Sequence, residues 1–366
     1  MARNIGIEGS VPSAGLLSLL PRYCHVGRQW PRLVCLLLAM TAPWPTRGFA
    51  GLARNKTDLI KEIVNPFFGY FVCDYFLGSE PTIEFATIAA PTALKWNTPE
   101  DAKRLKTGDM VYVQADFIDE FLVQYLPLVT ARFLLMTGQW REPYLTLDPT
   151  VDKRYLALKN GKQITTYILG HPLVAHWFVQ NPHIVDAKVS GIPYGVYHGT
   201  LVEYADALRK IDSVNKTAAM TLTYMSATHW SRAPLIAAAK KAGAMQATKA
   251  DPHMFYAQLA ASQFVFSPVG DRPDCYRHWE AIGLGAVPIC NCPHAFQGLY
   301  NRNMLFVAHE DFNVMTVLSE TWAQSAYRSP NRRLVLVAHW RQIFEVTRRS
   351  IVHNTTYEHS LNFRLT

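Results

Sequence analysis

The sequence lacks any apolar run of about 18 residues, the length that a membrane-spanning helix needs. Charged side chains are also scarce, at 17% of the residues, whereas hydrophobic side chains make up 49%. That balance excludes a disordered or tail-like protein, because such chains hold too few apolar residues to form a core. Low-complexity segments, heptads and fixed-period repeats are absent as well, which excludes coiled coils and repeat solenoids. A chain of 366 residues has room for two domains or one large one.

Cysteine is sparse, with six residues in the whole chain. Two of them lie in the first 50 residues, and the even remainder is compatible with disulfides in an oxidising compartment, with the pairing left open. Cys290-x-Cys292-x-His294 has the spacing of half a zinc site, but no second half matches it, so we expect no metal there. The four cysteines of the remainder are Cys73, Cys275, Cys290 and Cys292.

A concentrated basic region is missing too. The formal net charge is +8, and half of it comes from the first 50 residues, so the rest of the chain is only mildly basic. Nucleic-acid binding normally requires a basic face, and we therefore expect no nucleic-acid partner. A local basic pocket for a phosphate group is compatible with this charge.

The first 50 residues resemble a targeting segment. Leu33 to Ala42 form an apolar stretch that follows Arg28 and Arg32, and Gly48-x-Ala50 fits the small-x-small rule of a signal-peptidase site. We expect residues 1–50 to be a signal peptide or a short leader or anchor; a buried helix is the remaining alternative. Glycosylation sequons begin at Asn55, Asn215 and Asn354, and they favour a glycoprotein of the Golgi or ER lumen, or a secreted one.

Strand-like and helix-like segments alternate from about residue 56 onward. Short apolar runs bounded by turns predict buried parallel strands at 110–116, 131–138, 187–196, 220–226, 264–268 and 286–291. Helices are predicted at 117–129, 171–181, 200–212, 233–243, 252–262, 275–285 and 331–350. This rhythm predicts an α/β protein built from two Rossmann-like domains that face a cleft. The expected boundary lies near residue 195, between an N-terminal domain at 51–195 and a C-terminal domain at 196–366.

The segment from Phe264 to Asn291 is the most informative part of the chain. A strand leads into a Pro/Gly loop, and a helix begins near Asp274 or Cys275, so its positive end faces the loop. A loop that feeds a helix N-terminus at the carboxyl end of a parallel strand is a typical anion site. Arg277 in the first turn can bind a phosphate, and Glu280 can accept hydrogen bonds from ribose hydroxyls.

Plainer interpretations of the same helix stay open. Arg277 and Glu280 can form an ion pair on a solvated helix face. Trp279 is expected in the core, and His278 is expected to pack or to lie at the surface. Gly283 and Gly285 are expected to end the helix and to allow close approach to the next strand.

Three runs in this segment resemble the C-terminal signature of exostosin-like glycosyltransferases (glycosyltransferase family 47). They are Ser267-Pro268-x-Gly270, Asp274-Cys275-x-Arg277-x-Trp279-Glu280-Ala281 and Leu284-Gly285-x-x-Pro288-Ile289. Weaker similarity extends upstream to His176-Trp177-Phe178-x-x-Asn181, Lys188-Val189, Ile192-Pro193-x-Gly195 and Tyr224-Met225-Ser226 followed by Arg232. Asp271-Arg272-Pro273 departs from the family, which often has Gly or Asn in this loop.

The resemblance implies a GT-B fold and transfer of a sugar from a nucleoside-diphosphate sugar to a glycan or glycoprotein hydroxyl, with inversion at the anomeric carbon. It implies that the C-terminal domain holds the donor, with Arg277 at the diphosphate and Glu280 at the ribose. Arg232 adds a second positive charge, and Ser267 and Gly270 belong to the same donor-binding segment.

Metal-independent chemistry without a cofactor is expected, because the sequence has no Asp-x-Asp motif and because arginines and a helix N-terminus can stabilise a leaving diphosphate. Transfer also needs a base for the acceptor hydroxyl. The candidates are Asp116, Asp119, Glu120 and His171, and we select Asp116 because it ends the predicted strand at 110–116.

Two other functions fit parts of the sequence. A catalytically silent lumenal carbohydrate-binding or partner subunit with the same fold is the alternative, because no base is clearly marked. A dinucleotide oxidoreductase is disfavoured, since Gly283-x-Gly285 lacks a third glycine and ends a helix instead of opening one. The sequence leaves a hetero- or homo-oligomer open.

Overall fold

The computed structural model describes residues 49–83, 86–87, 89–138, 164–181, 186–227, 232–241, 250–270, 274–291, 303–307 and 327–353. All of these belong to one compact unit. Residues 1–48 of the expected leader, the sequon at Asn354, Cys292 and the Asp271-Arg272-Pro273 loop lie outside these ranges. No helix in the described ranges is long and apolar enough to cross a membrane.

The first sheet has six parallel strands in the order β4-β1-β5-β6-β7-β8. Their bounds are β1 (Tyr75–Leu77), β4 (Leu94–Lys95), β5 (Met110–Gln114), β6 (Phe133–Gly138), β7 (Val174–Gln180) and β8 (Val189–Ile192). Every residue of β5 and β6 is buried, which is why these strands appear in the sequence as continuous apolar runs. A separate antiparallel pair is formed by β2 (Thr82–Ile83) and β3 (Ala86–Thr87).

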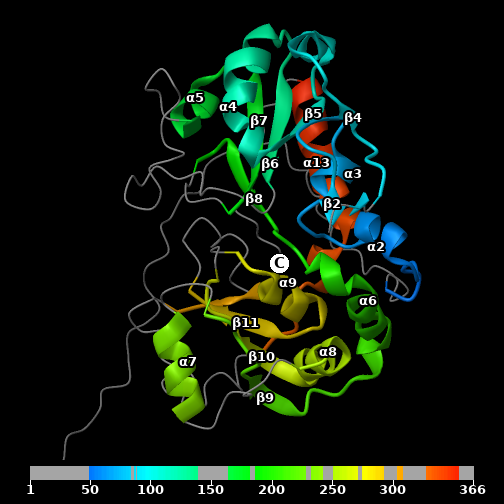
Figure 1. Ribbon diagram of the computed structural model, residues 1–366, viewed down its shortest axis with the longest axis vertical. Coiled ribbons are helices and arrows are strands. Elements are labelled where there is room, and N and C mark those ends of the chain that lie inside the picture. The colour runs from blue at the N-terminus through cyan, green and yellow to red at the C-terminus, as the bar shows by residue number, and fades with distance from the viewer. Residues whose placement is uncertain are drawn as a thin grey trace, which may run out of the picture. The chain divides into compact units, whose positions relative to one another are not determined.

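The second sheet has four parallel strands in the order β12-β11-β10-β9. They are β9 (Ala218–Thr221), β10 (Ser262–Phe266), β11 (Val287–Cys290) and β12 (Leu305–Phe306). Alternation along β10 places Phe264 and Phe266 in a cluster with residues of α7, whereas Val265 joins the core that includes residues of α8 and α9. Helices therefore cover both faces of this sheet (Figure 1). The two parallel sheets confirm the predicted α/β class.

The helices follow the predicted order with local exceptions. The α-helices are α2 (Lys56–Glu62), α3 (Gly69–Val72), α4 (Ile118–Glu120), α5 (Ile164–Gly170), α6 (Leu201–Lys210), α7 (Arg232–Lys241), α8 (Pro252–Ala261), α9 (Tyr276–Gly283) and α13 (Val337–Val352). Shorter helical turns are η2 (Pro99–Arg104), η3 (Ala115–Phe117), η4 (Phe121–Tyr125), η5 (Leu126–Leu128), η7 (His198–Thr200), η8 (Ile211–Ser213) and η10 (Arg332–Val335). Asp251 caps α8 as its sequence predicts, since its side chain accepts a hydrogen bond from the His253 N–H.

One element was predicted wrongly. Residues 171–181 were expected to be a helix, but Val174–Gln180 is strand β7, between β6 and β8. A strand in the middle of a parallel sheet is apolar on both faces, so its side chains show no alternation and mimic a buried helix. The predicted strand at 220–226 is also displaced, because β9 ends at Thr221.

The last helix returns to the first sheet. The Phe344 ring of α13 meets Phe178 of β7 edge-on, with 4.8 Å between the ring centroids. Arg341 donates a hydrogen bond to the Phe71 carbonyl, and Arg348 forms an ion pair with Asp74. The C-terminal segment thus packs on residues of the N-terminal half, and the division of the chain near residue 195 stays a prediction.

Candidate functional site: the carboxyl end of β10 and the start of α9

The segment between β10 and α9 is organised by a cap on the helix. Cys275 is the N-cap residue, and its backbone N–H donates to Nδ1 of His278 over 3.0 Å. Nε2 of His278 lies 2.9 Å from the Ser267 carbonyl oxygen, so this nitrogen carries the proton of the neutral ring and donates it. Ser267 is fully buried, and its N–H donates to the Ile289 carbonyl of β11. These bonds fix the predicted strand–loop–helix geometry.

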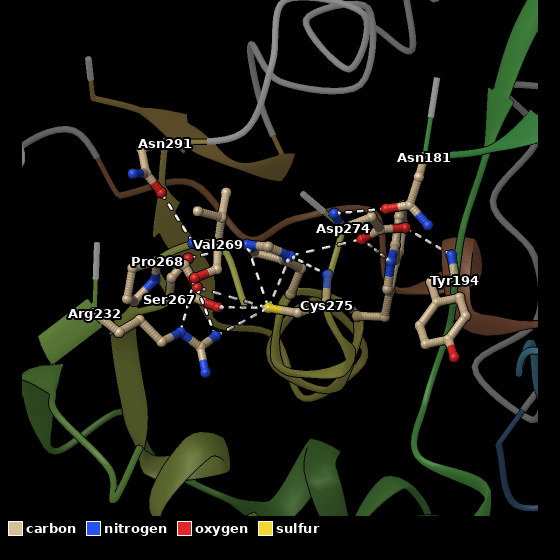
Figure 2. Close-up of polar contacts among 11 residues, drawn as sticks. Asn181, Tyr194, Arg232, Ser267, Pro268, Val269, Asp274, Cys275 and Asn291 are labelled. Atoms are coloured by element: carbon tan, nitrogen blue, oxygen red, sulfur yellow. Dashed lines mark hydrogen bonds and ion pairs between the residues drawn. The ribbon is translucent and has the colours of Figure 1, made fainter. Parts of the chain in front are cut away.

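Arg232 holds the loop that follows β10. Its guanidinium donates to the carbonyls of Val269 and Pro268 over 2.7 and 2.8 Å (Figure 2). It also donates to the Ser226 carbonyl over 3.4 Å. A side chain at Gly270 would place its Cβ 3.0 Å from Nη2 of Arg232, so the loop passes very close to this arginine. Arg232, Ser267 and Gly270 therefore lie close together, with Arg232 bonded to the backbone of the loop, and their role in donor binding stays a prediction.

Arg277 lies half-buried in the first turn of α9. One Nη atom donates to the Tyr224 carbonyl over 2.8 Å, in the loop after β9. Its Nε atom is buried and has no hydrogen-bond partner within the described ranges. Burial, followed by the nearby positive charge of Arg232, lowers the pKa of the guanidinium. A buried donor next to another cation is a position that an anion would stabilise.

Glu280 is buried, with 4% of its surface exposed, which overturns the alternative of a solvated helix face. Its Oε1 atom accepts hydrogen bonds from the Tyr197 N–H and the Tyr256 hydroxyl, both over 3.3 Å. Burial raises the pKa of Glu280 to about 7, although Arg277 and the two hydrogen bonds oppose the rise. Glu280 and Arg277, both on α9, thus each affect the pKa of the other.

Sequence analysis missed the contacts of Asp274. This buried carboxylate accepts from the Tyr194 N–H and from the Trp279 indole N–H, both over 2.6 Å. The Asp274 N–H donates in turn to the side-chain oxygen of Asn181, which has a φ of 52° (Figure 2). The ends of β7 and β8 in the first sheet are thereby joined to the start of α9. Asn181 belonged to the upstream resemblance, but nothing in its local sequence indicates Asp274 as its partner.

Two further residues complete this region. Asn291, directly after β11, accepts a hydrogen bond from the Val269 N–H over 2.9 Å. Trp279 is fully buried, as expected for a core residue, and His278 packs inside with no exposed surface. A side chain at Gly283 would overlap the Tyr204 hydroxyl of α6, so the close approach at this glycine is to a helix and not to the next strand. Gly285 ends the helix with a φ of 68°.

The candidate bases lie in the first sheet. Asp116 follows β5 and is exposed, and one of its carboxylate oxygens is 3.4 Å from Nε2 of Gln114. Asp119 and Glu120 are in the adjoining turn α4. His171 lies before β7, at the amino end of that strand, and its ring accepts from the Leu173 N–H. The carboxyl ends of strands form the ligand edge of open α/β sheets, so His171 is at the wrong end of β7 for the role considered.

Within the described residues, free thiols are present and no metal-ligand cluster is found. Cys73 is a free, buried thiol, and Cys275 is a free thiol of intermediate exposure. No group of three metal-ligating side chains occurs within the ranges that the structure describes. The Cys290-x-Cys292-x-His294 motif lies partly outside them.

Comparisons with known proteins gave one family-model match and several solved structures. A protein-family model, the RXYLT1 C-terminal domain, matches residues 212–355, which is less than half of the chain. No curated protein sequence matches. The solved structures found include the GtfA/B complex (13% identity, TM-score 0.35, covering 68% of this chain and 59% of that one). The pneumococcal O-GlcNAc transferase GtfA with UDP and GlcNAc gives 12% identity and a TM-score of 0.37, covering 69% and 59%.

A glycosyltransferase from Rickettsia africae ESF-5 gives 13% identity and a TM-score of 0.32, covering 74% of this chain and 83% of that one. The chain thus spans 59% of the length of the first two structures. The family-model match contains β10, α9 and β11, together with Arg232, Arg277 and Glu280. Residues 212–355 are therefore similar to a glycosyltransferase-like domain. This similarity supports a role in glycosyl transfer.

Proposed function

We propose that the protein is a glycosyltransferase that moves a sugar from a nucleoside-diphosphate sugar to a hydroxyl of a glycan or glycoprotein. The observation that carries the proposal is the placement of half-buried Arg277 and buried Glu280, one turn apart on α9, inside the segment that matches the family model. The exostosin-like subtype and the GT-B arrangement belong to the same proposal.

The donor diphosphate is proposed to bind at the start of α9. The N-terminal end of α9 carries partial positive charge, and Arg277 adds a donor whose buried Nε atom lacks a partner within the described ranges. Arg232 contributes its charge while holding the loop carbonyls. Glu280 offers a carboxylate to ribose hydroxyls in exchange for its present bonds to Tyr197 and Tyr256.

The chemistry proposed is inverting transfer without a metal or cofactor. Departure of a nucleoside diphosphate develops negative charge, which two guanidinium groups and a helix N-terminus stabilise in a partly buried site. A base accepts the proton of the acceptor hydroxyl, and Asp116 is our candidate because it is exposed at the carboxyl end of β5.

A lumenal or secreted glycoprotein stays part of the proposal. Asn55 and Asn215, the two sequon asparagines within the described ranges, are both exposed, as glycan attachment requires. The role of residues 1–50 as a signal or anchor, and any association with a second subunit, are likewise proposed from the sequence alone.

Purified protein incubated with a panel of nucleotide sugars tests the function. We expect binding of one donor by calorimetry and release of its nucleoside diphosphate in the presence of an acceptor. Arg277→Ala should weaken donor binding by about 1–3 kcal/mol, the cost of losing a charged hydrogen bond. The matched control is Arg349→Ala, which removes an exposed arginine of α13 that pairs with Glu345.

The outcomes separate the candidate functions. Donor or acceptor binding without transfer would favour the silent subunit, whereas no binding of any nucleotide sugar would refute the proposed site. Equal affinities of the wild type and Arg277→Ala would remove Arg277 from the diphosphate.

A further inference from the structure

The Cys275 thiol lies among groups that favour its ionised form. Its Sγ atom is 3.3 Å from Nδ1 of His278 and 3.8 Å from Nη2 of Arg232. The Ser267 hydroxyl and the Pro268 carbonyl are 3.9 and 3.8 Å away (Figure 2). This thiol therefore lies beside a base and a cation. Cys275 is part of the signature Asp274-Cys275-x-Arg277, but the proposed transfer reaction gives its thiol no role.

Among the described residues, charged and titratable groups from α7, from α9 and from the residue before the helix cap lie near this thiol. Arg232 approaches from α7, Arg277 and His278 belong to α9, and the Asp274 carboxylate lies 3.6 Å from Nδ1 of His278. Burial raises the pKa of the Cys275 thiol, but His278, Arg232 and Arg277 together outweigh burial, so that the pKa falls below its usual value. Glu280 interacts electrostatically with Arg277 of the same helix. The N-terminal end of α9 adds to the stabilisation of a thiolate.

We propose that Cys275 is a covalent modification site for small soft electrophiles, with His278 as its proton acceptor and Arg232 as its counter-ion. The thiol proton passes to Nδ1 of His278, which then gives up the hydrogen bond that it accepts from the Cys275 N–H. The Asp274 carboxylate, 3.6 Å from Nδ1, stabilises the resulting positive charge. With an alkyl halide, the sulfur then forms a bond to carbon as the carbon–halogen bond breaks, and halide leaves with the electron pair. Cys275 is partly exposed, whereas Cys73 is buried beside Met136 and serves as an internal reference.

Modification at this position has a consequence that rests on the proposed function. Cys275 is the N-cap of α9, directly before the turn at which we place the donor diphosphate. An adduct on Sγ would occupy space beside Arg232 and Arg277 and would replace a thiolate with a neutral thioether. We therefore infer that an adduct and a diphosphate exclude each other.

The wild-type protein provides the first test. Iodoacetamide is added at pH 6.5, and peptide mapping by mass spectrometry gives the modification rates of Cys275 and Cys73. The same measurement on protein unfolded in urea gives the rate of an ordinary thiol, which is only about 1% ionised at this pH. We expect folded Cys275 to react at least tenfold faster than unfolded Cys275, and folded Cys73 to react more slowly. A folded Cys275 no faster than the unfolded one overturns the proposal.

Variants test whether the fast modification of Cys275 depends on His278. Cys275→Ser should abolish the modified peptide, and His278→Gln should slow modification of Cys275 by about tenfold or more, because the base is removed. The matched control is His253→Gln, at an exposed position in the first turn of α8, which should react as the wild type does. An unchanged rate in folded His278→Gln refutes the role of His278. Should that variant not fold, the tenfold comparison in the wild type decides.

Inorganic pyrophosphate separates this inference from the proposed function. We expect saturating pyrophosphate to slow modification of Cys275 several-fold without changing Cys73. Fast modification that pyrophosphate does not slow supports the reactive thiol and overturns the placement of the diphosphate. The opposite result is that calorimetry detects bound pyrophosphate while Cys275 is modified slowly in its absence. That result supports the placement of the diphosphate and overturns the proposal of a reactive Cys275 thiol.

Discussion

At the scale of single residues, the buried titratable groups decide how the protein responds to pH. Glu280 and His339 are both almost fully buried, yet burial shifts their pKa values in opposite directions. The carboxyl of Glu280 has its pKa raised to about 7, and the imidazole of His339 has its pKa lowered to about 4. In each case burial favours the neutral form, so the charged form costs stability.

Glu280 makes stability fall as the pH rises. Its folded pKa of about 7 exceeds the usual value of 4.5, so its contribution is fully present below pH 4.5 and is lost as the pH rises toward 7. Glu280→Gln removes this titration. Between pH 4.5 and 7 the free energy of unfolding should fall in the wild type but not in the variant. We expect the difference, variant minus wild type, to increase by up to about 3 kcal/mol over this range. Urea unfolding at several pH values measures this, and parallel profiles would contradict it.

His339 behaves in the opposite sense. Its folded pKa of about 4 lies below the usual 6.5, so stability is present above pH 6.5 and is lost as the pH falls through 4. Both ring nitrogens lack a hydrogen-bond partner within the described ranges. His339→Leu should raise the free energy of unfolding at pH 7 by about 1–3 kcal/mol, the cost of an unsatisfied buried polar group. The gain should widen as the pH falls from 6.5 to 4.

Denaturant unfolding at pH 7 and pH 5 measures both effects. His253→Gln again serves as the control, because it removes an exposed imidazole and should leave stability unchanged. A loss of stability in His339→Leu would show that the imidazole has a partner beyond the residues described.

At the scale of elements, α9 is held by its neighbours as much as by its own sequence. The Tyr204 hydroxyl of α6 donates to the carbonyls of Trp279 and Glu280, and Asp274 ties the start of the helix to the residues after β7 and β8. The position of Arg277 and Glu280 therefore depends on contacts from several elements. A helix placed in this way cannot shift without breaking buried hydrogen bonds.

Gly283 marks the tightest of these contacts. Gly283→Ala would push a methyl group into the Tyr204 hydroxyl and against Val335, so we expect a loss of about 1–3 kcal/mol from overpacking. The matched control is Gly170→Ala at the end of α5, where an added Cβ meets no atom within 4 Å. Thermal and urea unfolding of both variants measure the difference. Equal stabilities of the two would mean that α9 and α6 can separate at no cost.

At the scale of the whole molecule, one hydrophobic core includes residues of both sheets. Met136 and Phe178 of the first sheet share this core with Val265 and Trp279 of the second half, and Phe344 of α13 completes it. We therefore expect the described residues after Trp44 to unfold as one cooperative unit, because exposing either half would expose the shared core.

Hydrogen exchange in increasing urea, followed by mass spectrometry, tests this cooperativity. Amides of β6 and of β10 should lose their protection at the same urea concentration, together with those of α13. If the amides of β10 instead lose protection at a lower urea concentration than those of β6, the two sheets belong to units that unfold independently. That result would agree with a domain boundary near residue 195.

Local sequence determined the segment from β10 to β11. Its pattern depends on residues that are close together in the chain, so it could be recognised directly. The pattern consists of apolar runs, a Pro/Gly loop and a helix with Arg277 and Glu280 one turn apart. The α/β class followed from the same alternation. Strand β7 escaped this reasoning because a centrally buried strand and a buried helix have the same apolar appearance.

Tertiary structure alone decided the surroundings of those residues. The bonds of Asp274 to Asn181 and Tyr194, and of Glu280 to Tyr197 and Tyr256, join segments that are far apart in the chain. The raised pKa of Glu280 and the thiol cluster of Cys275 arise from burial and from charges brought in by other elements. Such effects depend on distance in space, and a periodic pattern of residue types carries no information about them.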